Sequence, residues 1–154
     1  MLDSLVRAVL WLGYRVLRIS WLFHRPQLVG SYVAVWHRKR LLLIRNSYKS
    51  GETLPGGGIH RGESPREAAR RELAEEVGLE VAADQLEFAA EIDYRGSRAD
   101  DHVHFFELHL ENEPTLAIDR REVVWAGFCP AAELADRPLI GCIRAYIEGS
   151  RRTG

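Results

Sequence analysis

The sequence predicts a single α/β domain with an additional amphipathic helix at its N-terminus. The chain has 154 residues, which is the length of one domain. Short apolar runs typical of strands alternate along it with helical segments. Hydrophobic residues make up 46% and charged residues 28%, as in soluble globular proteins. No run of 18 apolar residues lacks a charge, so we expect no membrane-spanning helix.

Residues 2–23 form the first predicted helix. Its narrow polar stripe consists of Ser4, Arg7, Trp11, Arg15 and Arg18. The rest of the helical wheel is mostly apolar, which is typical of an amphipathic helix. A signal peptide is a weaker interpretation, because Arg15 and Arg18 interrupt the apolar run and no A-x-A cleavage site follows. Pro26 ends the helix, so we divide the chain into residues 1–27 and a domain over residues 28–154.

Charge is distributed unevenly between the two ends of the chain. Residues 1–49 carry a net charge of +8, and residues 50–154 carry −9. The wide apolar face of the first helix, with Trp21 and Phe23, is unfavourable in water. It could pack on its own domain, pair with a second subunit as a homodimer, or lie peripherally on an anionic membrane. Three arginines are few for a membrane helix, which favours burial against protein. No long Lys/Arg cluster supports a nucleic-acid contact.

The next elements are strands and a glycine-rich loop. Residues 32–36 and 41–44 read as a β-hairpin, with the charged residues 37–40 forming a longer turn. Residues 51–63 contain five of the thirteen glycines, which indicates a loop that bends sharply or lets a ligand approach the backbone.

A helix with clear capping signals at both ends follows this loop over residues 65–77. Ser64 is a natural N-cap, Pro65 suits the first helical position, and Glu67 completes a capping box. Gly78 supplies the end of the helix. Beyond it, residues 86–94, 103–110 and 123–128 are predicted strands, and residues 95–101 form a turn. Residues 130–134 and 138–148 are predicted helices.

The 65–77 helix has an acidic face. Glu72, Glu75 and Glu76 fall within an arc of ~100°, beside an apolar stripe of Ala69, Leu73 and Val77. Carboxylates this close repel one another, so an ordinary solvated face is the alternative to a functional one. The glycine-rich loop that leads into the helix favours function. Grouped hard oxygen ligands suit Mg²⁺ or Mn²⁺, and these ions bind phosphate oxygens.

Residues 57–79 carry a recognisable motif. They match the pattern G-x5-E-x7-R-E-U-x-E-E-x-G-U, where U is aliphatic, at all nine specified positions. The chain therefore resembles the Nudix (MutT-like) hydrolase family. Strong resemblance spans residues 54–79, and a weaker one in strand order covers about residues 28–135. The resemblance implies an α/β/α sandwich around a mixed sheet. It also implies divalent-metal-dependent hydrolysis of a nucleoside diphosphate linked to another moiety.

The resemblance also assigns roles to individual residues. Metal ligands are expected at Glu75 and Glu76, at Glu72 and at the backbone carbonyl of Gly56, with Mg²⁺ or Mn²⁺ as the cofactor. Glu72 is also the candidate general base, since a carboxylate near the attacking water can take its proton. Arg71 and Glu63 match a pair that orients the helix and loop, either in catalysis or as a purely structural salt bridge.

Several other residues are candidates. Glu122 lies just before the 123–128 strand, where some family members place a further metal ligand; an ordinary loop acid is the alternative. His102 and His104 share one strand face, but no zinc spacing links the histidines. They are interpreted as structural or exposed, with substrate contact as the alternative. Cys129 and Cys142 are expected to be buried free thiols, which indicates a reducing, cytoplasmic location.

The nucleotide substrate stays open at this stage. Family members specific for ADP-ribose tend to carry a proline about fifteen residues beyond the motif, where this chain has Tyr94. The diadenosine polyphosphate group tends to place a tyrosine slightly further on. The alternative to an enzyme is a nucleotide-sensing binding module of the same fold. Such a module usually lacks one or more of the carboxylates that this chain keeps.

Overall fold

The computed structural model describes the backbone of residues 2–24, 27–95, 100–118 and 120–153, and side chains within 4–17, 28–95, 100–118 and 120–150. The elements are α1 (Leu2–His24), β1 (Gln27–His37), β2 (Arg40–Asn46), β3 (Gly56–Gly58), α2 (Pro65–Val77), β4 (Glu87–Arg95), β5 (Asp100–Leu110), β6 (Val123–Pro130) and α3 (Gly141–Thr153). Single turns of 3₁₀ helix cover Ala83–Gln85 and Ala131–Glu133. The predicted helix end at residues 25–26, and the part of the predicted turn at 96–99, lie outside the described residues.

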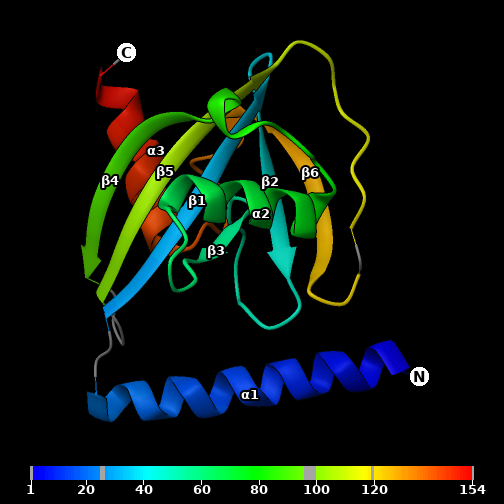
Figure 1. Cartoon of the computed structure of the whole chain (residues 1–154), viewed down its shortest axis with the longest axis vertical. Coiled ribbons are helices and arrows are strands. Elements are labelled where there is room, and N and C mark those ends of the chain that lie inside the picture. Colours follow the sequence, from blue (N-terminus) through cyan, green and yellow to red (C-terminus); the bar gives the residue numbers. More distant parts are fainter. Residues whose placement is uncertain (1, 25–26, 96–99, 119, 154) are drawn as a thin grey trace.

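A mixed sheet of six strands forms the centre of the molecule (Figure 1). Its order is β4-β5-β1-β2-β6, and β3 pairs with β1. Strands β1 and β5 are parallel, whereas the other pairs are antiparallel. Helix α2 covers one face of the sheet and α3 covers the other. This arrangement confirms the α/β/α sandwich with an additional N-terminal helix.

Two apolar layers hold the helices to the sheet. On the α2 side, the predicted anchors Ala69, Leu73 and Val77 are fully buried among sheet residues such as Val33 and Leu42. The layer on the α3 side contains Ile143 and other residues of that helix: Cys142, Tyr146 and Ile147. Both cysteines are free and buried, as expected.

Four local predictions were wrong. The turn predicted over residues 95–101 is shorter, because Arg95 belongs to β4 and Asp100 and Asp101 belong to β5. The hairpin turn between β1 and β2 is only two residues long, because His37 is buried and its Nδ1 lies 3.1 Å from the Leu110 carbonyl, which keeps it in the strand. Gly56–Gly58, predicted as loop, forms strand β3. Helix α3 starts at Gly141 rather than residue 138, because the Pro138 carbonyl accepts the Glu52 N–H at 2.8 Å instead of a helical N–H.

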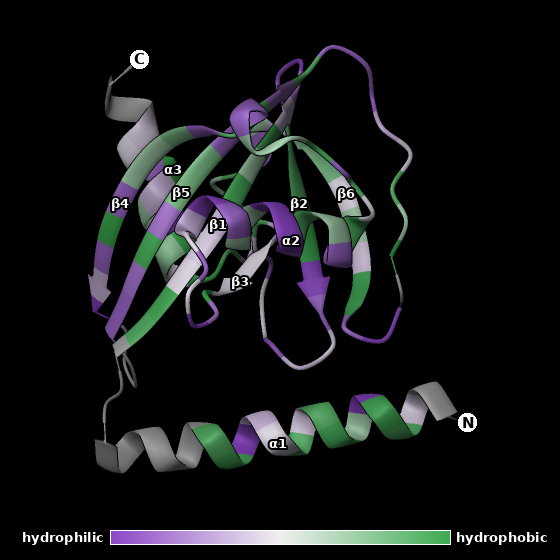
Figure 2. Cartoon of the chain, in the orientation of Figure 1, coloured by the Kyte–Doolittle hydropathy of each residue, from purple (hydrophilic) through white to green (hydrophobic). Residues whose placement is uncertain are grey.

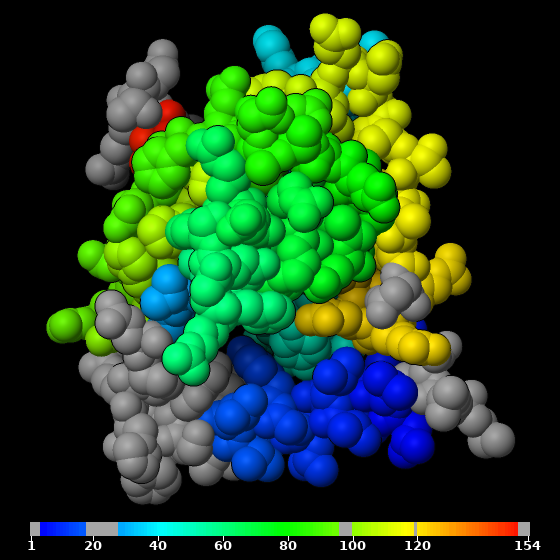
Figure 3. Space-filling model, viewed as in Figure 1, coloured from blue at the N-terminus to red at the C-terminus, as the bar shows by residue number. Residues whose placement is uncertain are grey.

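Helix α1 lies beside one end of the sandwich (Figure 1), and the space-filling view shows its described residues against that end (Figure 3). The Arg7 guanidinium donates to the Arg120 carbonyl. The Tyr14 ring lies 5.4 Å from the Tyr48 ring, centroid to centroid. Among the described helices, none is both long and apolar enough to span a lipid bilayer.

The apolar face of α1 points away from the domain. Arg7 and Tyr14 lie about 180° around the helix from a stripe at positions i, i+4, i+7 and i+11. That stripe consists of Leu5, Val9, Leu12 and Val16, which are 59–63% exposed. Figure 2 shows that hydrophobic residues recur along the described part of α1, which lies beside the sandwich. This stripe is therefore not packed on its own domain, although Arg7 and Tyr14 of the same helix contact the domain. The side chains of Arg18, Trp21 and Phe23 lie outside the described residues.

Candidate metal and phosphate site

Helix α2 has well-defined ends, which determine where its carboxylates lie. The Ser64 side chain accepts from the Glu67 N–H at 3.3 Å, and the Glu67 side chain accepts from the Ser64 N–H at 2.9 Å. Gly78 adopts the left-handed conformation at φ 71°, and its N–H donates to the Ala74 carbonyl. The predicted helix and both of its caps are confirmed. Since the apolar stripe is on the sheet, the acidic face turns toward the β3 loop.

Glu76 is the most buried carboxylate of this face, with 6% of its surface exposed. Its Oε2 accepts the Gly56 N–H at 2.7 Å, and its Oε1 accepts from Asn46 Nδ2 at 3.2 Å. Burial raises the pKa of Glu76 to about 8, although these hydrogen bonds and the charge of Lys49 act in the opposite direction. Neutral donors therefore compensate its charge incompletely, and a cation would complete the compensation.

The glycines of β3 allow close approach to α2. A Cβ on Gly57 would lie 2.5 Å from Glu72 Oε1. A Cβ on Gly56, at φ 150°, would lie 2.3 Å from the Ser31 carbonyl. Burial raises the pKa of Glu72, opposed by its hydrogen bond from Arg71. The Gly-rich segment thus brings backbone against both Glu72 and Glu76, whereas its composition predicted only a sharp bend or the approach of a ligand.

Arg71 connects the helix to the loop before it. Its guanidinium donates to Glu63 at 2.9 and 3.1 Å, to the Gly58 carbonyl at 3.0 Å and to Glu72 at 2.7 Å. It also lies 3.3 Å from a carboxylate oxygen of Glu75, which is 61% exposed. Hydrogen bonds, first from Arg71, lower the pKa of Glu63 to about 2. The structure therefore brings the predicted Arg71–Glu63 pair together and extends it to the acidic face.

Glu122 comes to the same region from the loop before β6. Its carboxylate accepts the Tyr48 hydroxyl at 2.5 Å. Its backbone carbonyl accepts the Ser47 N–H at 2.8 Å. The negative charge of Glu122 contributes to the raised pKa of Glu72, so the two carboxylates are electrostatic neighbours.

The four glutamates surround a common region without converging on one point. Among the described residues, no three of Glu72, Glu75, Glu76 and Glu122 have carboxylate oxygens mutually within 4.8 Å. Arg71 contacts both Glu72 and Glu75 and so holds part of this spacing.

Sequence reasoning missed the contribution of the segment that follows β2. Asn46, Tyr48 and Lys49 reach the glutamates through the contacts described above. The buried Asn46 Oδ1 has no hydrogen-bond partner among the described residues. The available signal was a run of polar residues directly after the buried strand 41–44. No spacing rule connects that run with α2, because only the fold brings the two together.

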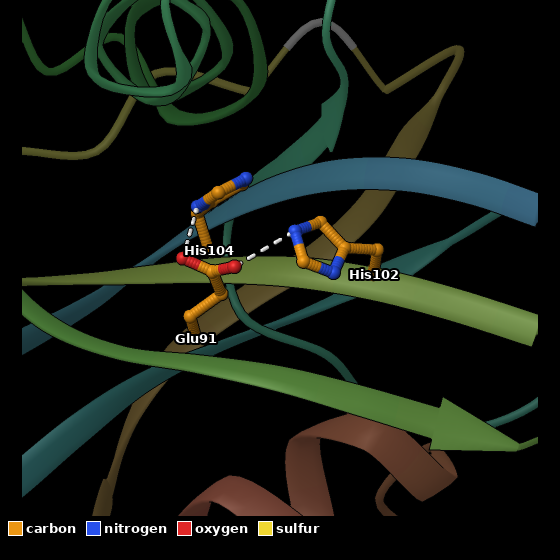
Figure 4. Close-up of side chains that lie close together, drawn as sticks. All are labelled: Glu91, His102 and His104. Carbon is orange, nitrogen blue, oxygen red and sulfur yellow. Dashed lines mark ion pairs between the residues drawn. The ribbon is translucent and has the colours of Figure 1, made fainter.

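The histidines do not join the glutamates of α2. His102 and His104 instead contact Glu91 of β4 (Figure 4). His60 is exposed on the loop before α2. His109 is exposed and lies 3.1 Å from Glu107. The sequence placed His102 and His104 on one strand face, but it gave no signal for Glu91, which the strand register brings opposite His104.

Comparisons with known proteins identify the fold and its motif. The NUDIX domain family matches residues 26–146. A Mycobacterium tuberculosis protein named "Putative 8-oxo-dGTP diphosphatase 2" is 36% identical over 104 residues, which are 65% of this chain and 68% of that protein. The chain therefore belongs to the Nudix family, and it is a Nudix hydrolase.

Solved structures of low sequence identity share the fold. The MutT protein from Methanosarcina mazei has 19% identity and a TM-score of 0.70, covering 84% of this chain and 96% of that one. The NUDIX domain of NrtR from Shewanella oneidensis, complexed with ADP ribose, has 20% identity and a TM-score of 0.70, covering 82% and 88%. An Ap4A hydrolase from C. elegans has 17% identity and a TM-score of 0.68, covering 82% and 96%. Helix α1 precedes the residues that the family matches.

Proposed function

We propose that this protein hydrolyses a phosphoanhydride bond in a nucleoside diphosphate linked to another moiety, using Mg²⁺ or Mn²⁺. The single observation that carries the proposal is Glu76, a buried carboxylate that only neutral groups hydrogen-bond, on the same helix face as Glu72 and Glu75. Retention of all these carboxylates favours turnover over nucleotide sensing alone.

The residues present fit a hard divalent cation. Glu72, Glu75, Glu76 and Glu122 offer carboxylate oxygens, and Gly56 offers a backbone carbonyl, which are the donors such ions prefer. When bound, the cation neutralises charge that develops on the phosphate oxygens and makes water more acidic. Arg71 and Glu63 keep the glycine-rich loop against α2. Glu72, whose pKa is raised by burial, is the proposed acceptor of the proton from the attacking water.

The proposed substrate class is a nucleoside triphosphate or a related phosphoanhydride. The name of the Mycobacterium tuberculosis relative indicates 8-oxo-dGTP as the first compound to assay. Tyr94 packs against the start of α3, where a Cβ on Gly141 would lie 2.1 Å from its hydroxyl oxygen. This packing gives Tyr94 a structural role and does not support the diadenosine polyphosphate alternative. We propose a cytoplasmic location, in keeping with the two buried free thiols.

A panel of nucleotides tests this function. The purified chain is incubated with 8-oxo-dGTP, normal nucleoside triphosphates, ADP-ribose and Ap4A, with Mg²⁺ or with a chelator, and products are separated by chromatography. Reaction in water enriched in oxygen-18 shows which product receives the oxygen and therefore which phosphorus is attacked. We expect metal-dependent turnover of at least one compound. Glu75→Gln should lower it strongly, whereas Glu80→Gln, an exposed acid beyond the helix, should not. Nucleotide binding without turnover would favour the sensing module.

We propose further that the exposed stripe of α1 packs against a second copy of the chain rather than a membrane. The two arginines of this helix whose side chains are described already have intramolecular contacts: Arg7 with the Arg120 carbonyl, and Arg15 with the Trp11 ring at 4.7 Å. Light scattering should report a dimer that Val9→Asp converts to monomer, because Val9 is 63% exposed at the centre of the stripe. A wild-type monomer that co-sediments with anionic vesicles would contradict this assignment.

A further inference from the structure

A second cluster of metal-ligand side chains lies across strands β4 and β5 (Figure 4). Glu91 Oε1 lies 3.0 Å from His102 Nε2, and Glu91 Oε2 lies 3.6 Å from His104 Nδ1. One ligand atom from each of the three residues lies within 4.8 Å of the other two. The two imidazole rings are perpendicular, with centroids 5.0 Å apart. One nitrogen of each imidazole and a carboxylate oxygen therefore lie close together on one face of the sheet.

The strand register builds this cluster. In the antiparallel β4–β5 pair, Glu91 is opposite His104, and Asp93 is opposite His102. Directly opposed residues on one face have Cβ atoms about 5 Å apart, so the four side chains form a compact square. The strands, rather than flexible loops, determine where the ligands lie. The two histidines are 16% and 25% exposed, and Glu91 is 49% exposed, so water can reach the open side of the cluster.

Asp93 orients one of the ligands. Its Oδ1 lies 2.6 Å from His102 Nδ1, while His102 Nε2 faces Glu91. Histidines that bind metals commonly donate their other ring N–H to a carboxylate, which fixes the tautomer and makes the ligand nitrogen more basic. The contact between Asp93 and His102 has this arrangement.

The donor set differs from that of the α2 site. Glutamates and a backbone carbonyl suit Mg²⁺, whereas two imidazoles and one carboxylate suit Zn²⁺ and similar transition metals. Zn²⁺ bound by three protein ligands retains one position for water. β4 is at the edge of the sheet, so an ion held by Glu91 of β4 and two histidines of β5 would fasten the edge strand to its neighbour.

We propose that Glu91, His102 and His104 form a second metal site, which binds one divalent transition-metal ion of the Zn²⁺ type and clamps β4 to β5. The site is separate from the glutamates of α2, and its occupancy does not depend on the hydrolytic activity proposed above. Asp93 is a positioning residue that acts through His102.

Zinc binding to the full-length chain tests this site. Isothermal titration calorimetry with Zn²⁺, in the presence of excess Mg²⁺, should show one ion per chain. His102→Ala and His104→Ala should each abolish this binding. Asp93→Asn should weaken it about 10–100-fold, because the orienting carboxylate is lost. His109→Ala is the matched control, because it removes an exposed histidine of the same strand that contacts a single carboxylate; its affinity should equal that of the wild type.

A structural readout accompanies the titration. Zn²⁺ should raise the melting temperature of the wild type. It should also raise that of Glu76→Gln, because this substitution does not touch the β4–β5 site. It should not raise that of His102→Ala. Side-chain ¹⁵N spectra should report Zn²⁺ at His102 and His104. The proposal is overturned if the wild type binds no Zn²⁺, or if the bound ion persists in both histidine variants. Zn²⁺ binding that only Glu76→Gln removes would assign the ion to the α2 site and would equally overturn it.

Discussion

Two buried carboxylates, on opposite sides of the sheet, have very different surroundings. Glu52, 4% exposed, receives two N–H groups from the Arg137 guanidinium at 2.7 and 2.8 Å. Glu76, 6% exposed, receives only the neutral N–H groups of Gly56 and Asn46. Arg137 also lies over the Trp125 ring, at 5.6 Å from its centroid. Glu52 is thus paired with a cation of the chain itself, which suits a structural role. The negative charge of Glu76 has no such hydrogen-bonded cation among the described residues, so a metal ion from solution could neutralise it.

The largest expected effect separates the two residues by activity. Glu76→Gln keeps the shape of the side chain but removes its charge, so Mg²⁺-dependent turnover should fall by orders of magnitude. Its stability without metal should equal or exceed that of the wild type, because a buried amide needs no cation. Steady-state kinetics and thermal unfolding check this pair of results. Near wild-type turnover at saturating Mg²⁺ would show that Glu76 does not bind the catalytic metal.

The second prediction reverses this pattern at Glu52. Glu52→Gln leaves the Arg137 guanidinium without its carboxylate, which should cost about 3 kcal/mol of unfolding free energy. This value is at the low end for a broken buried pair because 28% of the Arg137 side chain remains exposed to water. Denaturant unfolding measures it. The affinity for Mg²⁺ should not change. A stable Glu52→Gln variant would remove the distinction between the two sites.

The third prediction concerns the start of α2, on which the position of Glu76 depends. Ser64→Ala removes the N-cap acceptor of the Glu67 N–H, and should cost about 1 kcal/mol of stability. Activity should fall less than in Glu76→Gln. Ser50→Ala, an exposed serine on the loop after β2, is the control. If Ser64→Ala and Ser50→Ala have the same unfolding midpoint, the capping box does not contribute to stability.

The smallest effect is expected at the ion pair between Glu63, on the loop before α2, and Arg71. The pKa of Glu63 is lowered from 4.5 to about 2, chiefly by the hydrogen bond from Arg71. A carboxyl whose pKa is lower in the folded chain stabilises the fold above pH 4.5, and this stabilisation is lost as the pH falls toward 2. Glu63→Gln should therefore be less stable at pH 6 but lose less stability on acidification. Urea unfolding midpoints of the wild type and of Glu63→Gln, measured between pH 6 and pH 2, check how steeply the stability of each protein depends on pH.

Local sequence signals predicted much of this architecture. Ser64, Glu67 and Gly78 are sufficient to define α2 because capping depends on residues close together in the chain. The nine-position motif likewise placed Glu63 and Arg71 in contact. The candidate residues of the catalytic site could therefore be predicted from the sequence, without knowledge of the fold.

Features that depend on contacts between distant segments could not be read from the sequence. Asn46 reaches Glu76 across 30 positions. Glu91 meets His102 and His104 only because of the β4–β5 register. The late start of α3 follows from a backbone hydrogen bond between the Glu52 N–H and the Pro138 carbonyl. In each case the partner lies on another element, where helical or strand periodicity gives no information.

The capped ends of α2 limit which insertions and deletions this helix can accept. The capping box fixes the first turn, and a Cβ on Gly78 would lie 2.8 Å from Ala117 Cβ, so the last turn is confined as well. The helix therefore has a fixed count of 13 residues. One residue inserted after Arg71 would rotate every later side chain by about 100°, which would place Glu72 and Glu76 on the apolar stripe and turn Leu73 and Val77 away from the sheet. Along this segment the chain tolerates substitution at exposed positions, but it has no tolerance for a change in length.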